Sequence, residues 1–109
     1  MKKLYLILLL LVIPMNIHAT DLTLTWDDDP NNTAVKFRMY KQLNCSNSFV
    51  PIGDIIFPTL TFTEPNITTG TNCYQVTALD SLDVESIPSN TLTVTCSKGA
   101  HKTINCSGV

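Results

Sequence analysis

The stretch GTNCYQVTALD, residues 70–80, decides the fold class of this chain. Within it Tyr74, Val76 and Ala78 alternate with more polar residues. Successive side chains of a β-strand point to opposite faces, so this alternation is typical of a strand that buries one face. We therefore predict a strand here, with a core on the side of its apolar residues.

Shorter stretches on both sides show the same alternation. Strands are expected at residues 22–26, 35–40, 49–57, 60–63 and 91–95. Pro51 indicates that the weakest of them, at 49–57, lies at a sheet edge. About six short strands, separated by polar turns, are typical of an antiparallel sandwich or a small barrel. The expected core residues are Leu22, Leu24, Trp26, Val35, Phe37, Met39, Leu60, Phe62, Tyr74, Val76, Ala78, Leu92 and Val94.

The first residues have a different character. Lys2 and Lys3 precede an apolar run from Leu4 to Ile13, and the small residue Ala19 follows. This order of parts is typical of a secretory signal peptide, and the run is shorter than the roughly 20 residues that span a bilayer. We expect residues 1–19 to be removed, which predicts a secreted protein, periplasmic or extracellular, with no stable membrane span.

The four cysteines, Cys45, Cys73, Cys96 and Cys106, all follow the predicted signal peptide. An even number of cysteines in a short exported chain is typical of disulfides, and four of them allow three pairings. A zinc site is the alternative, but zinc ligands usually come in closely spaced pairs. Only His101 lies near enough in the sequence to join Cys96 and Cys106 in such a site.

The charge balance excludes some partners and activities. Without Lys2 and Lys3 the chain keeps five of its seven basic residues and all nine acidic ones, so its net charge is near −4. Nucleic acids and anionic membranes require basic patches, so no nucleic-acid partner is expected. His101 is interpreted as an exposed tail residue, and we predict neither an enzyme nor a bound cofactor.

Four segments together resemble the fibronectin type III family. They are Trp26-Asp27, Phe37–Lys41, Gly70–Asp80 and Glu85–Asn90, and the resemblance extends roughly from Leu22 to Thr95. It implies an all-β, antiparallel, immunoglobulin-like sandwich whose first strand is short or absent here. The tyrosine that anchors the corner before the sixth strand of this family has no clear counterpart in the sequence.

The resemblance also implies a disulfide pairing. The third and sixth strands of this fold are antiparallel neighbours, which favours Cys45–Cys73 and leaves Cys96–Cys106 to hold the tail. Cys73–Cys96 is the second choice for Cys73, since the sixth and seventh strands are neighbours too. We therefore expect a domain at residues 20–96 and a C-terminal tail at 97–109 that is fixed by a disulfide.

In the same fold the loop after the Trp-bearing strand and the loop before the last strand lie at one end. A weak calcium site is conceivable there, because calcium prefers several carboxylate oxygens; solvated turn residues are the favoured interpretation. The carboxylates concerned are Asp27, Asp28, Asp29, Asp80, Asp83 and Glu85. Leu82, Val84 and Ile87 are expected to cap the core, with a contact patch as the alternative.

These observations predict a secreted, non-catalytic binding or spacer module. Its end loops and strand edges would contact a protein or surface partner whose identity the sequence does not specify. The alternative is a structural subunit of a surface or virion assembly that pairs through strand edges, which includes a homo-oligomer.

Overall fold

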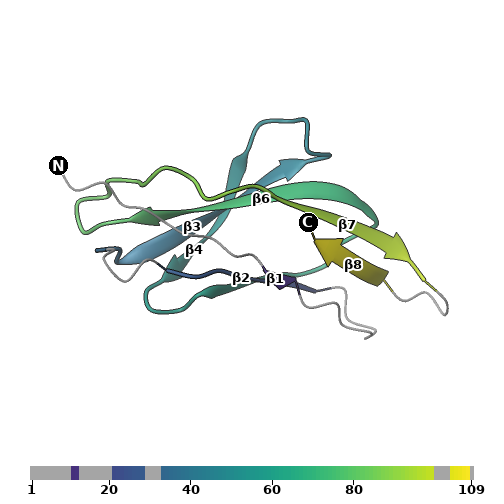
Figure 1. Cartoon of the computed structure of the whole chain (residues 1–109), viewed down its shortest axis with the longest axis horizontal. Helices are drawn as coiled ribbons and strands as arrows, with labels where there is room; N and C mark the ends of the chain where they lie inside the picture. Colours follow the sequence, from purple (N-terminus) through teal and green to yellow (C-terminus); the bar gives the residue numbers. More distant parts are fainter. Residues whose placement is uncertain (1–10, 13–20, 29–32, 100–103, 109) are drawn as a thin grey trace.

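The computed structural model describes residues 11–12, 21–28, 33–99 and 104–108. Its strands are β1 (Leu11–Val12), β2 (Leu22–Thr25), β3 (Lys36–Leu43), β4 (Val50–Ile56), β5 (Thr61–Glu64), β6 (Gly70–Leu79), β7 (Leu92–Lys98) and β8 (Ile104–Gly108). They form two antiparallel sheets, ordered β1-β2-β5 and β4-β3-β6-β7-β8. The two sheets lie face to face (Figure 1), as the alternating pattern predicts.

The stretch that decides the fold class is the centre of the larger sheet. β6 pairs with β3 over the whole length of β3, from Lys36 opposite Leu79 to Leu43 opposite Asn72. Its other edge pairs with β7. β6 is therefore the central strand of this sheet, with β3 and β4 on one side and β7 and β8 on the other.

The core between the sheets holds most of the apolar residues that were expected there. Tyr74, Phe37, Leu24 and Met39 are among its largest fully buried side chains. Trp26 is 2% exposed, and its ring meets that of Phe37 edge to face at 5.6 Å. Leu60 and Phe62 are partly buried and pack against this core.

One predicted core residue is wrong. Val35 is 45% exposed, whereas Ala34 beside it is 7% exposed. β3 begins only at Lys36, so Val35 lies before the pleat that would turn it inward. The Val35 backbone bonds to the end of β6 and to the loop after β4, since Val35 N donates to Leu79 O and Val35 O accepts from Phe57 N.

The sheet edge predicted from Pro51 is confirmed. β4 is the outer strand of the larger sheet, and its register with β3 shifts between Met39 and Tyr40, opposite Pro51. Gly53 follows, and a Cβ atom at this position would come within 2.5 Å of the Phe62 ring. The glycine thus allows β4 to approach the ring of a residue on the opposite sheet.

Two strands lie outside the six that the sequence pattern indicates. β8 lies within the expected tail and forms a hairpin with β7, which continues to Lys98. Both strands of this hairpin belong to the larger sheet. Its five residues contain only two inward positions, too few for a periodic signal. β1 lies within the predicted signal peptide and pairs with β2; the remainder of residues 1–20 falls outside the described part of the chain.

Candidate functional site

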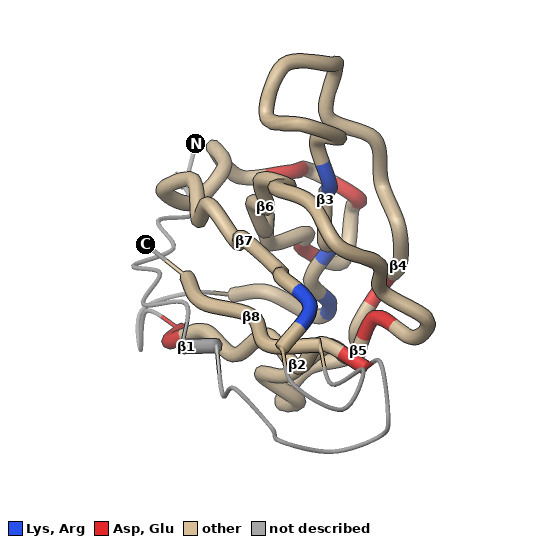
Figure 2. The backbone as a smooth tube through the Cα atoms, turned by 90° about the vertical axis from the view of Figure 1, so that its right-hand side faces the viewer, with Lys and Arg blue, Asp and Glu red and all other residues tan. Residues whose placement is uncertain are grey.

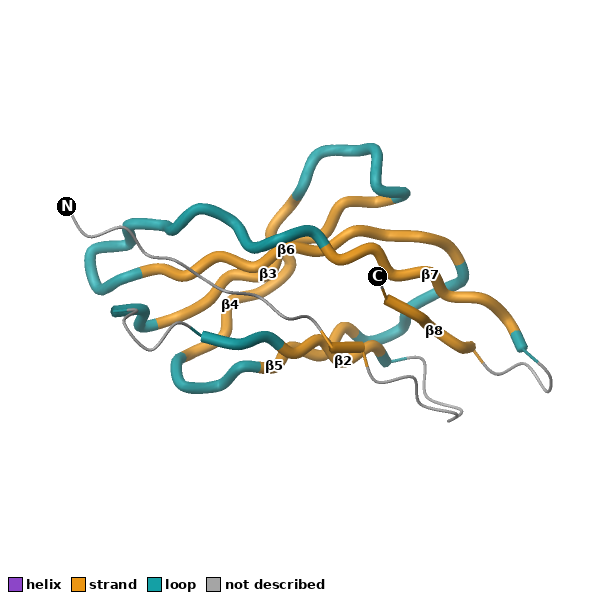
Figure 3. Tube along the Cα trace, viewed as in Figure 1, coloured by secondary structure: helices purple, strands orange, loops and turns teal. Residues whose placement is uncertain are grey.

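The loop after β2, the loop between β4 and β5, and the first part of the loop between β6 and β7 lie at one end of the sandwich (Figure 1 and Figure 3). Asp80 organises the last of these loops. Its Oδ1 accepts hydrogen bonds from Leu82 N at 2.8 Å and Val84 N at 3.0 Å. Asp83 adopts a positive φ of 61°, which closes the turn.

Glu85 is fixed to the outer face of the larger sheet. Thr77 Oγ1 donates to Glu85 Oε2 at 2.5 Å, and the Tyr40 hydroxyl donates to the same oxygen. Burial raises the pKa of Tyr40, and the Glu85 carboxylate raises it further by favouring the protonated phenol. Glu85 therefore ties the long loop to β3 and β6.

Ion pairs continue this network across β3 and β4. Arg38 Nε donates to Asp54 Oδ1 at 2.8 Å, and this hydrogen bond lowers the pKa of Asp54. Lys36 Nζ lies 3.6 Å from both Asp54 and Asp83. Figure 2 shows the described basic positions along β3 and at the end of β7, whereas acidic positions occur over several loops and strands.

In the described part of the chain, three of the carboxylates of the calcium hypothesis bind separate partners. Among the described residues, no three His, Cys, Asp or Glu side chains are grouped as a metal site requires. Asp80 binds its own loop, Asp83 pairs with Lys36, and Glu85 bonds to Tyr40 and Thr77. Asp29 lies outside the described residues. Local hydrogen bonds of this kind are typical of acidic turn residues.

The expectation that the loop between β6 and β7 caps the core is wrong. Leu82 is 81% exposed, Ile87 is 64% exposed and Val84 is 44% exposed. At the same end Ile56 is 67% exposed, with Phe57 and Val35 each at 45%. Leu82, Val84, Ile56, Phe57 and Val35 are called the end surface below.

A second polar feature was missed by the sequence interpretation. Glu64 accepts from Lys41 Nζ at 2.7 Å and from the Tyr74 hydroxyl at 2.5 Å, between the sheets. Burial, followed by the hydrogen bond to Glu64, raises the pKa of Tyr74 well above its usual range. Lys41 and Glu64 each occupy an inward position of their strand, so their phase was a detectable signal.

This cluster borders a pocket of about 190 Å³. The pocket lies where β3 ends and β6 begins, and Lys41, Asn44, Asn66, Asn72 and Tyr74 contribute to its lining. The side-chain amide of Asn72 is engaged with the turn after β3, since the backbone N–H of Asn44 donates to Asn72 Oδ1 at 3.1 Å. The hollow is small, and its polar groups mainly join the end of β3 to β6.

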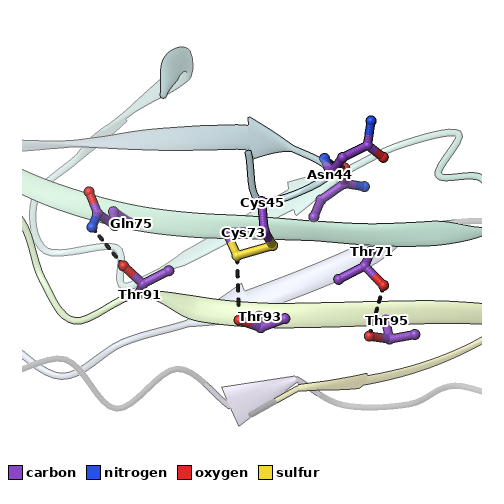
Figure 4. Close-up of a disulfide and its surroundings, with 9 residues drawn as sticks. Asn44, Cys45, Thr71, Cys73, Gln75, Thr91, Thr93 and Thr95 are labelled. Carbon is purple, nitrogen blue, oxygen red and sulfur yellow. Dashed lines mark hydrogen bonds between the residues drawn. A yellow bond between two sulfur atoms is a disulfide. The ribbon is translucent and has the colours of Figure 1, made fainter. Parts of the chain in front are cut away.

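Both favoured disulfides are present. Cys45 pairs with Cys73 and Cys96 with Cys106, and none of the cysteines is free. Figure 4 shows the first bridge beside a row of polar pairs that joins β6 to β7 on the outer face of the sheet. The pairs are Gln75–Thr91 at 2.7 Å, Cys73–Thr93 at 3.4 Å and Thr71–Thr95 at 3.1 Å. His101 lies outside the described residues.

Solved structures with a similar fold come from several organisms. The fibronectin type III domain of human fibronectin type III domain containing protein 3 has a TM-score of 0.61 and 18% identity, over 82% of this chain and 83% of that one. An Fn3-like protein from Clostridium thermocellum has a TM-score of 0.58 and 18% identity, over 77% and 88%. This chain has a fibronectin type III-like fold.

Part of a much longer protein also has a fold similar to that of this chain. A β-1,2-glucanase from Parabacteroides distasonis has a TM-score of 0.60 and 20% identity over 80% of this chain, which spans only 12% of the glucanase. At these identities the similarity concerns the fold alone. No protein-family model and no curated protein matches the sequence.

Proposed function

We propose that this protein is a secreted, non-catalytic binding module that contacts a protein partner through the end surface. The exposure of Leu82, at 81%, carries this proposal. Single exposed apolar side chains are normal, but Leu82 lies at the same end of the sandwich as four other exposed apolar residues, and exposed apolar patches are typical of interaction sites. The fibronectin type III-like fold, which suggests a binding or spacer module, supports the same conclusion.

The charges around the end surface define the chemistry of the partner. Asp80, Asp83 and Asp27 lie in the loops at this end. Lys36, which follows Val35 in the sequence, is already paired with the carboxylates of Asp54 and Asp83. A negative field around an apolar centre favours a partner with basic residues around an apolar one. The net charge near −4 of the chain without residues 1–19 acts in the same direction.

A photo-crosslinking experiment tests this function. A crosslinking amino acid at position 82 is expected to give one dominant adduct in the native host, weakened by high salt. The matched control is position 43, because Leu43 is 50% exposed at the other end of β3. Equal adducts from both positions, or none from position 82, would contradict the proposal.

Secretion is part of this proposal. The signal-like order of residues 1–19 supports it, and two disulfides in a small domain are compatible with an extracellular location. No helix among the described residues has the length and hydropathy needed to cross a bilayer. Mass spectrometry of the exported protein should find Thr20 at its N-terminus, and retention of Met1 would contradict the processing.

A structural subunit that pairs through strand edges is the second candidate. The observation that favours it is the pairing of β1 with β2, Leu11 opposite Thr25 and Val12 opposite Leu24. This pairing indicates that the edge of β2 accepts an extended segment. If signal cleavage removes β1, the same edge becomes available to another chain. A strict monomer at all concentrations in light scattering would exclude this role.

A further inference from the structure

The edges of the two sheets differ in how they are protected. An open edge exposes unpaired backbone N–H and C=O groups and tends to pair with another strand unless proline, charge or a bulge prevents it. β4 contains Pro51 and faces a register shift, and β5 ends in Glu64 before Pro65. β8, Ile-Asn-Cys-Ser-Gly, contains neither proline nor charge.

The register of β8 shows which of its backbone groups are free. Cys106 lies directly opposite Cys96, with 4.0 Å between the Cα atoms. Such a short spacing identifies the non-hydrogen-bonded type of antiparallel pair, in which the N–H and C=O groups point away from the partner strand. With the period of two, Ile104, Cys106 and Gly108 therefore direct their backbone groups to the open edge, and Asn105 and Ser107 direct theirs to β7.

We propose that this edge pairs with the β8 edge of a second copy of the chain, antiparallel and about a two-fold axis at Cys106. In that register Cys106 meets the Cys106 backbone of the other copy as a hydrogen-bonded pair. Ile104 lies opposite Gly108, and the exposed Asn105 lies opposite the exposed Ser107. The larger sheets of the two copies then form one continuous sheet.

The side-chain sequence of β8 favours a second copy as the occupant. When two β8 strands pair antiparallel, the bulky Ile104 of one copy lies opposite Gly108 of the other, which has no side chain. The Asn105 amide lies opposite the Ser107 hydroxyl. It brings no like charges together, although the chain as a whole is acidic. Such self-complementarity is what a two-fold interface requires.

The edge is also prepared for binding. All five residues of β8 are paired with β7, and the Cys96–Cys106 disulfide fixes the hairpin, so little conformational entropy is lost on association. β1 lies next to β8 in the full chain, so removal of the predicted signal peptide clears this side of the sandwich. The interface is short, and we expect a weak, concentration-dependent dimer.

This inference deepens the strand-pairing candidate and is independent of the end surface. The test uses the exported protein, with its N-terminus checked by mass spectrometry. In light scattering its weight-average mass is expected to rise toward twofold with concentration. In amide exchange the N–H groups of Ile104, Cys106 and Gly108 should become protected over the same range, whereas those of Asn105 and Ser107 are protected throughout.

Charge variants on the outer face give a matched pair. Asn105→Lys with Ser107→Lys places like charges opposite each other and should abolish the mass increase. Asn105→Lys with Ser107→Glu places opposite charges there and should preserve it, with a dependence on salt. The proposal is overturned if both variants dimerise alike, or if the wild-type mass stays constant. Protection that appears at Leu22–Thr25 and not at β8 would also overturn it, and would leave the β2 edge as the pairing site.

Discussion

Gly53 is a single residue on which the approach of the two sheets depends. A Cβ atom at this position would lie 2.5 Å from one atom of the Phe62 ring and 3.2 Å from another. Gly53→Ala is therefore expected to destabilise the protein by about 1–3 kcal/mol, the usual cost of overpacking a core. Urea unfolding followed by tryptophan fluorescence measures this loss, since Trp26 is buried in the same core.

The double variant Gly53→Ala with Phe62→Leu is the control for this prediction. The smaller side chain at position 62 frees the space that the new methyl group needs. We expect the double variant to lose less free energy of unfolding than the sum of the losses of the two single variants. Strict additivity would show that the ring is not the obstacle and that the backbone of Gly53 causes the loss.

Tyr74 makes stability depend on alkaline pH. Its pKa is raised in the folded protein by burial and by Glu64. Its contribution to the free energy of unfolding is therefore complete below about pH 10, the pKa of an unfolded tyrosine, and is lost as pH rises above that value. We expect the free energy of unfolding to fall above about pH 10, because the unfolded chain ionises first. Urea unfolding at several alkaline pH values measures this slope.

Tyr74→Phe separates this effect from general alkaline denaturation. The variant should be less stable at neutral pH, since Glu64 loses one hydrogen-bond donor, and its alkaline slope should be smaller than that of the wild type. Absorbance at 295 nm gives an independent reading in the exported protein. Complete tyrosinate formation near pH 10 with the fold intact would refute the raised pKa.

At the scale of elements, the two disulfides act on different parts of the sandwich. Cys45–Cys73 closes a loop of 28 residues and links the end of β3 to β6, whereas Cys96–Cys106 closes a loop of 10 residues within one hairpin. Loop-closure entropy predicts losses of about 3.5 and about 2.5 kcal/mol when each pair is changed to serine. Chemical denaturation of the two double variants compares these values.

The two variants should also differ in the region that loosens. Without Cys96–Cys106, we expect the amides of β8 to exchange rapidly while β3 and β6 stay protected, because among the described strands β8 pairs only with β7. Without Cys45–Cys73 the whole sheet is weakened, since β6 is its centre. Equal, global loss of protection in both variants would contradict this division.

Strands with several inward residues could be predicted from the sequence, and shorter ones could not. β6 has Tyr74, Val76 and Ala78 on one face, so its period is evident. β8 offers only Ile104 and Cys106, and its existence depends on pairing with β7, which no local pattern encodes. The prediction that Val35 is a core residue was wrong for a related reason. Where β3 begins depends on backbone contacts with distant residues, which the local pattern does not encode.

The candidate sites show the same limit. Which loops carry acidic and apolar residues could be read from the sequence. The direction of Leu82 could not, because it follows from a turn that Asp80 forms with the backbone N–H groups of Leu82 and Val84. The Lys41–Glu64–Tyr74 cluster was detectable in principle. Each of its members occupies the apolar phase of a strand, and charged residues in that phase need partners from other strands.

At the scale of the whole molecule, the proposed contacts lie in different places. The end surface lies where β3 begins and where β4 and β6 end, whereas the open edge of β8 is the outer edge of the larger sheet and faces away from β7. A dimer through β8 would therefore leave both end surfaces accessible. Two weak sites on one dimer can hold a partner array more strongly than either site alone, provided that the spacing allows simultaneous binding.

The last prediction concerns how the end surface finds its partner. Charges around an interface mainly change the association rate, whereas buried apolar contacts mainly change the dissociation rate. Once the crosslinked partner is identified, Asp27→Asn should slow association and weaken its salt dependence, and Leu82→Ser should speed dissociation. Asp21→Asn is the control, because it removes the same charge at the other end of β2. Charges separated by more than the screening length of about 8 Å at physiological salt interact little, so this variant should hardly affect a partner on the end surface. Surface plasmon resonance of the three variants decides the matter: equal effects of Asp21→Asn and Asp27→Asn would mean that net charge alone drives association and that the end surface has no directing role.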